Sequence, residues 1–210
     1  MKKIAFLAGY LLLFSTCILS QIFPGQLEPG KVPMPVHHYQ QEYTFDTVIN
    51  DKAWQGQTPG LHVSFGTTNQ LYMRREVPSL TKTLNWEETG WRGEKLNAQV
   101  LVWAQDTIGQ VRITLNNLVN AKGRMLDKKN IKLHLIRYVV SNYPYGAKDA
   151  TCGVSHYNGL YLMPDRLAPF ERFDLPGKTI RPLWLSIDIP TGTEPGAYTG
   201  SIEVKSGNSS

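Results

Sequence analysis

The sequence lacks the short motifs on which several classes of enzyme depend. It contains no Gly-rich phosphate loop, no His-Glu-x-x-His and no Cys-x-x-Cys pair. Gly153-Val154-Ser155-His156 is not a nucleophile elbow, because that turn needs glycine on both sides of the serine. There are only two cysteines in 210 residues. The motifs therefore indicate no nucleotide, metalloprotease or thiol chemistry, and we expect no cofactor.

Positive charge is scarce once the first residues are set aside. Lys2 and Lys3, the apolar run 4–14 and the small residues of 15–20 predict a signal peptide over residues 1–20. Removing the two lysines leaves 20 basic side chains from the original 22, against 17 acidic ones, a net charge of +3. This charge forms no stripe, so we expect no nucleic-acid partner.

The predicted leader places the protein outside the cytoplasm: periplasmic, associated with the outer membrane, or secreted. Its apolar run is shorter than the about 20 residues of a spanning helix, so we expect no transmembrane segment. Lipidation of Cys17 is the alternative, although a small residue other than Thr16 usually precedes such a cysteine. After cleavage, Cys152 stands alone, and no intrachain disulfide can form.

The remaining chain divides by composition. Residues 21–41 are rich in Pro and Gly and predict an extended arm, 42–205 predict one β domain, and 206–210 predict a linker or tail. Apolar and polar residues alternate over 96–104, 111–116, 131–135, 183–189 and 198–205, the pattern of strands with one buried face. A phase shift through Ile136, Tyr138 and Val140 indicates a bulge or a strand buried on both sides.

No window has a sustained helical period, so the fold class expected is all-β. Strands separated by turn residues predict an antiparallel β-sandwich, immunoglobulin-like or jelly-roll-like. The stretch 141–178 is poorly periodic and reads as a long loop, a feature that usually has a function or packs on something else.

Potential catalytic and metal-binding groups are weakly supported. Cys152 with His156 lacks a third, orienting group, and His37, His38 and His62 would need further ligands to hold a metal. Glu87 and Glu88 are adjacent on an extended chain and face opposite sides. Asp165, Glu171 and Asp174 lie in the long loop, where two acids could flank a sugar, but nothing in the sequence selects a pair. We therefore assign no catalytic and no metal-binding residue.

The aromatic side chains are the stronger candidates for contact. Trp103 and Trp184 fall on the outer parity of their strands beside polar residues, and Tyr157 and Tyr161 lie in the long loop. An exposed indole can stack on a sugar ring. The favoured interpretation is that these side chains are covered by loops or by another domain, because large apolar patches usually mark a protein contact.

The sequence resembles the N-terminal domain of glycoside hydrolase family 123-like proteins over about residues 43–205. The matching segments are Gly60–Asn69 with Tyr72 and Arg74, Trp91–Lys95, Ala98–Trp103, Pro164-Asp165, Arg181–Pro190 and Glu194–Gly200. We expect the signature residues to be structural: Trp91, Gly93, Glu94, Pro164, Asp165, Pro182, Pro195, Gly196 and Tyr198. Gly93 and Gly196 suit turns with positive φ, Pro182 and Pro190 are expected to flank a strand, and Tyr198 starts a strand on its inward side.

The resemblance implies a β-sandwich ahead of a TIM-barrel catalytic domain. That family removes β-linked N-acetylgalactosamine by substrate-assisted catalysis with an adjacent Asp-Glu pair on the barrel. This sequence has no Asp-Glu dipeptide and no room for a barrel of about 250 residues. We therefore predict a non-catalytic accessory domain whose partner is the catalytic domain. The alternatives are a stand-alone carbohydrate-binding module with a glycan partner, and an extracellular interaction domain.

Overall fold

The computed structural model describes residue 42 and residues 49–141 and 160–207. The predicted signal peptide, arm and tail end, together with Cys17, His37, His38, Cys152, His156 and Tyr157, lie outside these residues. The elements are α1 (Asp51–Gln55), β1 (Leu61–Gly66), β2 (Lys95–Ala104), β3 (Ile108–Leu115), β4 (Leu118–Asn120), β5 (Met125–Leu126), the 3-10 turn η1 (Lys128–Asn130), β6 (Ile131–Ser141), β7 (Tyr161–Ala168), β8 (Phe173–Leu175), β9 (Thr179–Asp188), β10 (Tyr198–Thr199) and β11 (Ile202–Lys205).

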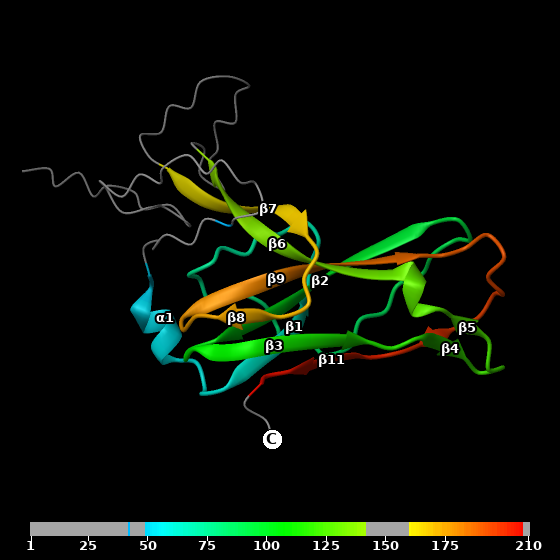
Figure 1. The fold of residues 1–210 in the computed structure, drawn as a ribbon, viewed down its shortest axis with the longest axis horizontal. Coiled ribbons are helices and arrows are strands. Elements are labelled where there is room, and N and C mark those ends of the chain that lie inside the picture. Colours follow the sequence, from blue (N-terminus) through cyan, green and yellow to red (C-terminus); the bar gives the residue numbers. More distant parts are fainter. Residues whose placement is uncertain (1–41, 43–48, 142–159, 208–210) are drawn as a thin grey trace, which may run out of the picture.

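The fold is mostly β, and every strand pairing in the described residues is antiparallel, as predicted (Figure 1). The largest sheet has the order β1-β2-β9-β6-β7, and two smaller sheets have the orders β10-β4-β5 and β11-β3-β8. No helix in the described part of the chain is long and apolar enough to cross a membrane.

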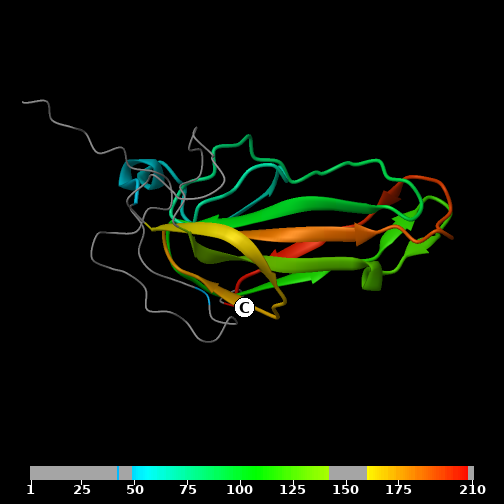
Figure 2. The same ribbon diagram turned by 90° about the horizontal axis from the view of Figure 1, so that it is seen from above.

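One hydrophobic core joins the three sheets. Its buried side chains come from β2, β6 and β9 of the large sheet and from β3, β5 and β8 of the small sheets. The large sheet therefore packs one face against both small sheets, and Figure 2 shows this layering from above. The inward residues have the predicted parity, including Val100, Val111, Leu135 and Leu185.

The second face of the large sheet is more covered than the alternation predicted. From Ala98 to Ala104, all residues of β2 are buried, on both faces. A second cluster lies over the outward residues Leu101 and Trp103 and contains Trp54 of α1 and Tyr72. The expectation of one buried face was wrong here because the β1–β2 connection and α1 form a non-sheet cover.

The stretch 141–178 is not a single loop, because it contains β7 and β8. Sequence reading missed β7 because Pro164 interrupts its pattern. A proline is tolerated there because β7 is the edge strand of the large sheet. Asp165, which was predicted to lie in the long loop, therefore lies on β7 instead.

The phase shift predicted a bulge or burial on both sides, and β6 is buried on both sides, with Leu135 in the main core and Tyr138 in a separate cluster, while its pairing with β7 changes register. Arg137 pairs with Arg166, but Tyr138 pairs with Pro164, so Asp165 is the additional residue on β7. Its position therefore breaks the ladder at a point where the strand is bent.

Pro182 does not flank β9 as expected, since it lies inside this central strand and pairs with Leu101. The backbone N–H of Ile180 donates to Arg74 O at 2.9 Å, on the edge away from β2. Peptide groups alternate in direction along a strand, so the Pro182 nitrogen faces that same edge. The pairing of β9 with β6 ends at Leu183, and the missing N–H therefore removes no ladder hydrogen bond.

The predicted last strand, 198–205, is divided into β10 and β11. Tyr198 has the inward packing expected of it, but the chain changes partner from β4 to β3 around Gly200. A Cβ atom at Gly200 would lie 2.6 Å from Leu118 Cδ2 and 3.0 Å from Asn117 O. This close approach explains why a glycine stands at the break.

Candidate interaction sites

Trp103, predicted as a contact candidate, is only 5% exposed. Its indole N–H donates to Gln57 Oε1 at 3.1 Å, the His62 ring stacks on it with centroids 5.4 Å apart, and Lys82 Nζ lies 5.8 Å from its centroid. Sugar stacking on this indole would require the cover to open. The geometry thus agrees with coverage by loops rather than with an exposed platform.

The other predicted aromatic candidates differ in their surroundings. Trp184 is half-buried, and its N–H donates to Asn97 Oδ1 at 3.1 Å. Asn97 also accepts from Ser186 Oγ at 2.9 Å, so this polar group is already engaged. Tyr161 is 2% exposed. The described members of the candidate set therefore do not form a shared exposed platform, and their contact role stays a prediction.

A buried cluster of charges lies beside this covered face. Glu42 Oε1 accepts from Arg181 Nη1 at 2.5 Å and from the backbone N–H of Tyr138 at 3.0 Å. The side chains of Arg181 and Glu42 are only 7% and 13% exposed. Arg74 is also buried, and burial, together with Arg181 and Arg75, lowers its pKa. Glu42 is thus the carboxylate that offsets a local excess of guanidinium charge.

Tyr138 connects this cluster to the sheet. Its hydroxyl lies 3.1 Å from both Tyr72 O and Ile180 O, and the Arg181 guanidinium lies 5.5 Å from its ring centroid. Burial raises the pKa of the hydroxyl, so Tyr138 stays neutral and acts as a donor. The arrangement is structural in character, because Glu42 and the Tyr138 hydroxyl each join segments that are far apart in the sequence.

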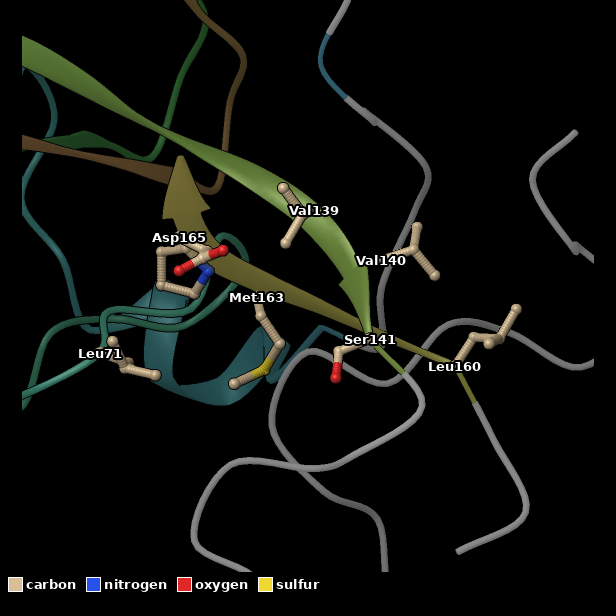
Figure 3. A pocket seen from close by; sticks show the side chains of 8 residues that line it. Leu71, Val139, Val140, Ser141, Leu160, Met163 and Asp165 are labelled. Carbon is tan, nitrogen blue, oxygen red and sulfur yellow. The ribbon is translucent and has the colours of Figure 1, made fainter. Parts of the chain in front are cut away.

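The scattered acids do not assemble into a catalytic pair. Asp174 Oδ1 accepts from the backbone N–H of Gln110 at 2.8 Å, while Glu171 is exposed beyond β7. Asp165 lines a concavity of about 660 Å³ whose other described lining residues carry no carboxylate (Figure 3). Glu87 and Glu88 are exposed, as their solvated interpretation predicted. A hydrolase of the two-carboxylate type needs both acids in one cleft.

The metal hypothesis also gains no support from the geometry. The described residues contain no group of three or more His, Cys, Asp and Glu side chains that could hold an ion. His62 instead places Nε2 2.7 Å from Thr58 O, as a donor, while its ring stacks on Trp103.

Trp91, expected to be a structural residue, is the most exposed large apolar side chain in the described residues, at 82%. It opens a turn in which Glu94 N–H donates to Trp91 O at 3.0 Å, and Glu94 Oε2 accepts from Trp91 N–H at 2.7 Å. Gly93 has φ +87°, and its N–H donates to Ile189 O at 2.7 Å. The signature Trp-Arg-Gly-Glu therefore builds a fixed turn that presents an indole to solvent.

Replacing Gly93 with alanine is expected to destabilise the protein by about 1–2 kcal/mol, because a Cβ atom is strained at positive φ. Gly192 offers a matched control in the neighbouring connection, since a Cβ atom there meets nothing within 4 Å and its φ is not in the strained range. Urea unfolding of Gly93→Ala and Gly192→Ala measures the difference. Equal stability of the two variants contradicts the strained-turn interpretation.

Gly196, with φ +149°, confirms the other positive-φ prediction.

Glu76 supplies a pH-dependent prediction. Burial raises its pKa above the usual 4.5, so its ionised form is disfavoured in the folded state. This penalty is present above the folded-state pKa and disappears below the unfolded-state pKa. Because the side chain is partly exposed, Glu76→Gln is expected to gain under about 1 kcal/mol at pH 7–8. Thermal unfolding at pH 4 is expected to show no gain, and an equal gain at both pH values contradicts the assignment.

These observations define a class: a mostly β domain whose signature residues build turns, close approaches and strand pairing, with one exposed indole on a fixed turn. Residues 65–206 match the model of a protein family described as "Glycoside hydrolase 123 N-terminal domain". The chain therefore belongs to the glycoside hydrolase 123 N-terminal domain family, as its resemblance implied.

A solved structure extends this comparison. The chain is similar to a family 123 glycoside hydrolase from Clostridium perfringens, studied for glycolipid glycan hydrolysis, with 25% identity and a TM-score of 0.60. The similarity covers 72% of this chain and 25% of that one. The chain thus spans about a quarter of the length of the solved relative. A search of curated proteins finds no match.

Proposed function

We propose that this chain is the non-catalytic accessory domain of an exported family 123-like glycoside hydrolase, and that it packs on a TIM-barrel catalytic domain. One observation carries the proposal. The structural similarity covers most of this chain but only a quarter of the C. perfringens enzyme. Larger enzymes of this family thus contain the domain beside other structure. The two packed layers support the finer assignment of a β-sandwich.

The scattered acids support the absence of catalysis from this domain. The described carboxylates are engaged in turns, in ion pairs or with solvent, and among the described residues that line its concavity Asp165 is the acidic one. By family similarity, the substrate of the complete enzyme would carry β-linked N-acetylgalactosamine. The predicted signal peptide supports export to the periplasm, the outer membrane or the medium.

The test is an assay of β-N-acetylgalactosaminide hydrolysis by residues 21–210 and by the complete gene product read from the source DNA. We expect turnover only by a longer product, and a lower thermal midpoint of that product when residues 21–205 are deleted. Turnover by residues 21–210 alone contradicts the non-catalytic assignment. A gene product that ends at Ser210 contradicts the partnership within one chain.

A further inference from the structure

Trp91 marks an end of the domain where several apolar side chains are exposed. Five large apolar side chains are exposed in the described residues: Leu84 and Leu167, and the three considered below, Trp91 at 82%, Met125 at 59% and Val119 at 40%. Val119 and Met125 are direct cross-strand partners on β4 and β5. Cross-strand partners lie on one face of a sheet, so they form a single apolar pair.

The connection from β9 to β10 joins this pair to the Trp91 turn. At its start, Gly93 N–H donates to Ile189 O, and a Cβ atom on Gly93 would lie 3.6 Å from Thr191 Cγ2. Farther along, Glu194 Oε1 lies 3.3 Å from Arg124 Nε, next to Met125. Figure 1 shows β4, β5 and this connection together at one end of the molecule. We call Trp91, Val119 and Met125 the end surface.

The Trp91 turn is held firmly for a segment that exposes an indole. Four hydrogen bonds fix it: two between Trp91 and Glu94, and two that join Gly93 and Glu94 to Ile189 at 2.7 and 2.8 Å. Gly90 precedes it in a tight space, where a Cβ atom would lie 2.6 Å from Ile189 Cδ1. The backbone that carries the indole is thus already fixed and loses little conformational entropy on binding, which suits an interface anchor.

We propose that the end surface docks on the catalytic part of the same family 123-like enzyme, with Trp91 as the anchor. This inference rests on the proposed function and adds to it the face that makes the contact. The required partner is large, because the solved relative has about three quarters of its length outside the similarity. Trp and Met are enriched at the centres of protein interfaces, and charged residues lie at their rims.

The composition of the end surface favours a protein over a sugar. Val119 and Met125 add apolar area without a side-chain hydrogen-bonding group, and the Glu94 carboxylate is engaged with Trp91 N–H. A sugar site needs polar groups that converge on the ring hydroxyls. The ion pair of Arg124 with Glu194 lies beside the apolar pair, where it forms part of a charged rim.

The experiment measures the accessibility of a cysteine beside the anchor. Arg92→Cys, in a background with Cys152→Ser, is labelled with a maleimide in residues 21–210 and in the longer gene product. We expect labelling to be at least about tenfold slower in the longer product. This factor corresponds to a free energy of about 1.4 kcal/mol in favour of the docked state, in which the cysteine is covered. Leu167→Cys on β7, at a site that is 48% exposed, is the matched control and is expected to label equally in both.

A second substitution separates docking from mere crowding. Adding Trp91→Ala to Arg92→Cys is expected to restore fast labelling in the longer product. Equal labelling of Arg92→Cys in both proteins overturns the proposal, as does protection that survives Trp91→Ala. Protection of residues 21–210 by a β-linked N-acetylgalactosamine oligosaccharide overturns it in favour of glycan binding.

The two proposals fail in different ways. If the longer product hydrolyses its substrate and loses stability without this domain, but position 92 labels equally, the accessory function stands and the docking face is wrong. If the longer product shows neither property, the accessory function itself fails.

Discussion

Replacing Glu42 with alanine is expected to lower the free energy of unfolding by about 3–5 kcal/mol, because it leaves a buried guanidinium without its counter-charge. Arg181 would then face Arg74 with no carboxylate between them, and Tyr138 N–H would lose its acceptor. The loss is large against a typical total stability of about 5–15 kcal/mol. Urea unfolding followed by circular dichroism measures it.

Two further variants separate burial from simple loss of an ion pair. Asp51→Ala removes the exposed pair with Lys178, whose side chains are 61% and 37% exposed, and is expected to cost under about 1 kcal/mol. Glu42→Leu combined with Arg181→Met is expected to recover only part of the stability lost in Glu42→Ala, since the Arg181 charge is removed together with its partner while the Arg74 guanidinium stays buried. If Glu42→Ala costs no more than Asp51→Ala, Glu42 does not offset buried guanidinium charge as described above.

Replacing Trp54 with alanine is expected to cost about 3–5 kcal/mol, the usual range for deletion of a fully buried Trp side chain. Trp54 is 0% exposed, and its N–H donates to Arg75 O at 2.8 Å. The five-residue α1 has no stability of its own without this contact. Its detachment would uncover Trp103, so the emission of the remaining tryptophans is expected to shift to longer wavelength.

The indole at position 91 provides the control, because it is as large but exposed. Trp91→Ala is expected to change stability by less than about 0.5 kcal/mol in residues 21–210. Trp54→Phe keeps most of the packing but leaves Arg75 O without its donor, and should cost about 1–3 kcal/mol. Similar stability of Trp54→Ala and Trp91→Ala would show that α1 does not hold the cover in place.

Periodicity was sufficient to predict the inward faces of β2, β3, β6 and β9, because burial on one side leaves a repeat of two in the sequence. It could not predict the cover over Leu101 and Trp103, since the residues that form it have no regular repeat. Tyr72 and Trp54 lie in an irregular connection and a single helical turn. Their burial depends on tertiary contacts between segments far apart in sequence.

For the same reason, the sequence could not show how exposed the candidate aromatic side chains are. Outward parity indicated Trp103 and Trp184 but carried no information on what lies above them. Trp91 was read as part of a turn motif, and its turn was predicted from Gly93. The direction of its side chain depends on the hydrogen bonds of Glu94 and Ile189, which a local pattern does not contain.

The residues that cover the large sheet determine where the domain can be truncated. The family similarity begins at residue 65, but α1, Glu42 and most of β1 precede it. An expression boundary set at residue 65 would remove the carboxylate of the buried pair and the indole that closes the second face. The cooperative unit is therefore larger than the matched domain, and a stable truncation has to begin before Glu42.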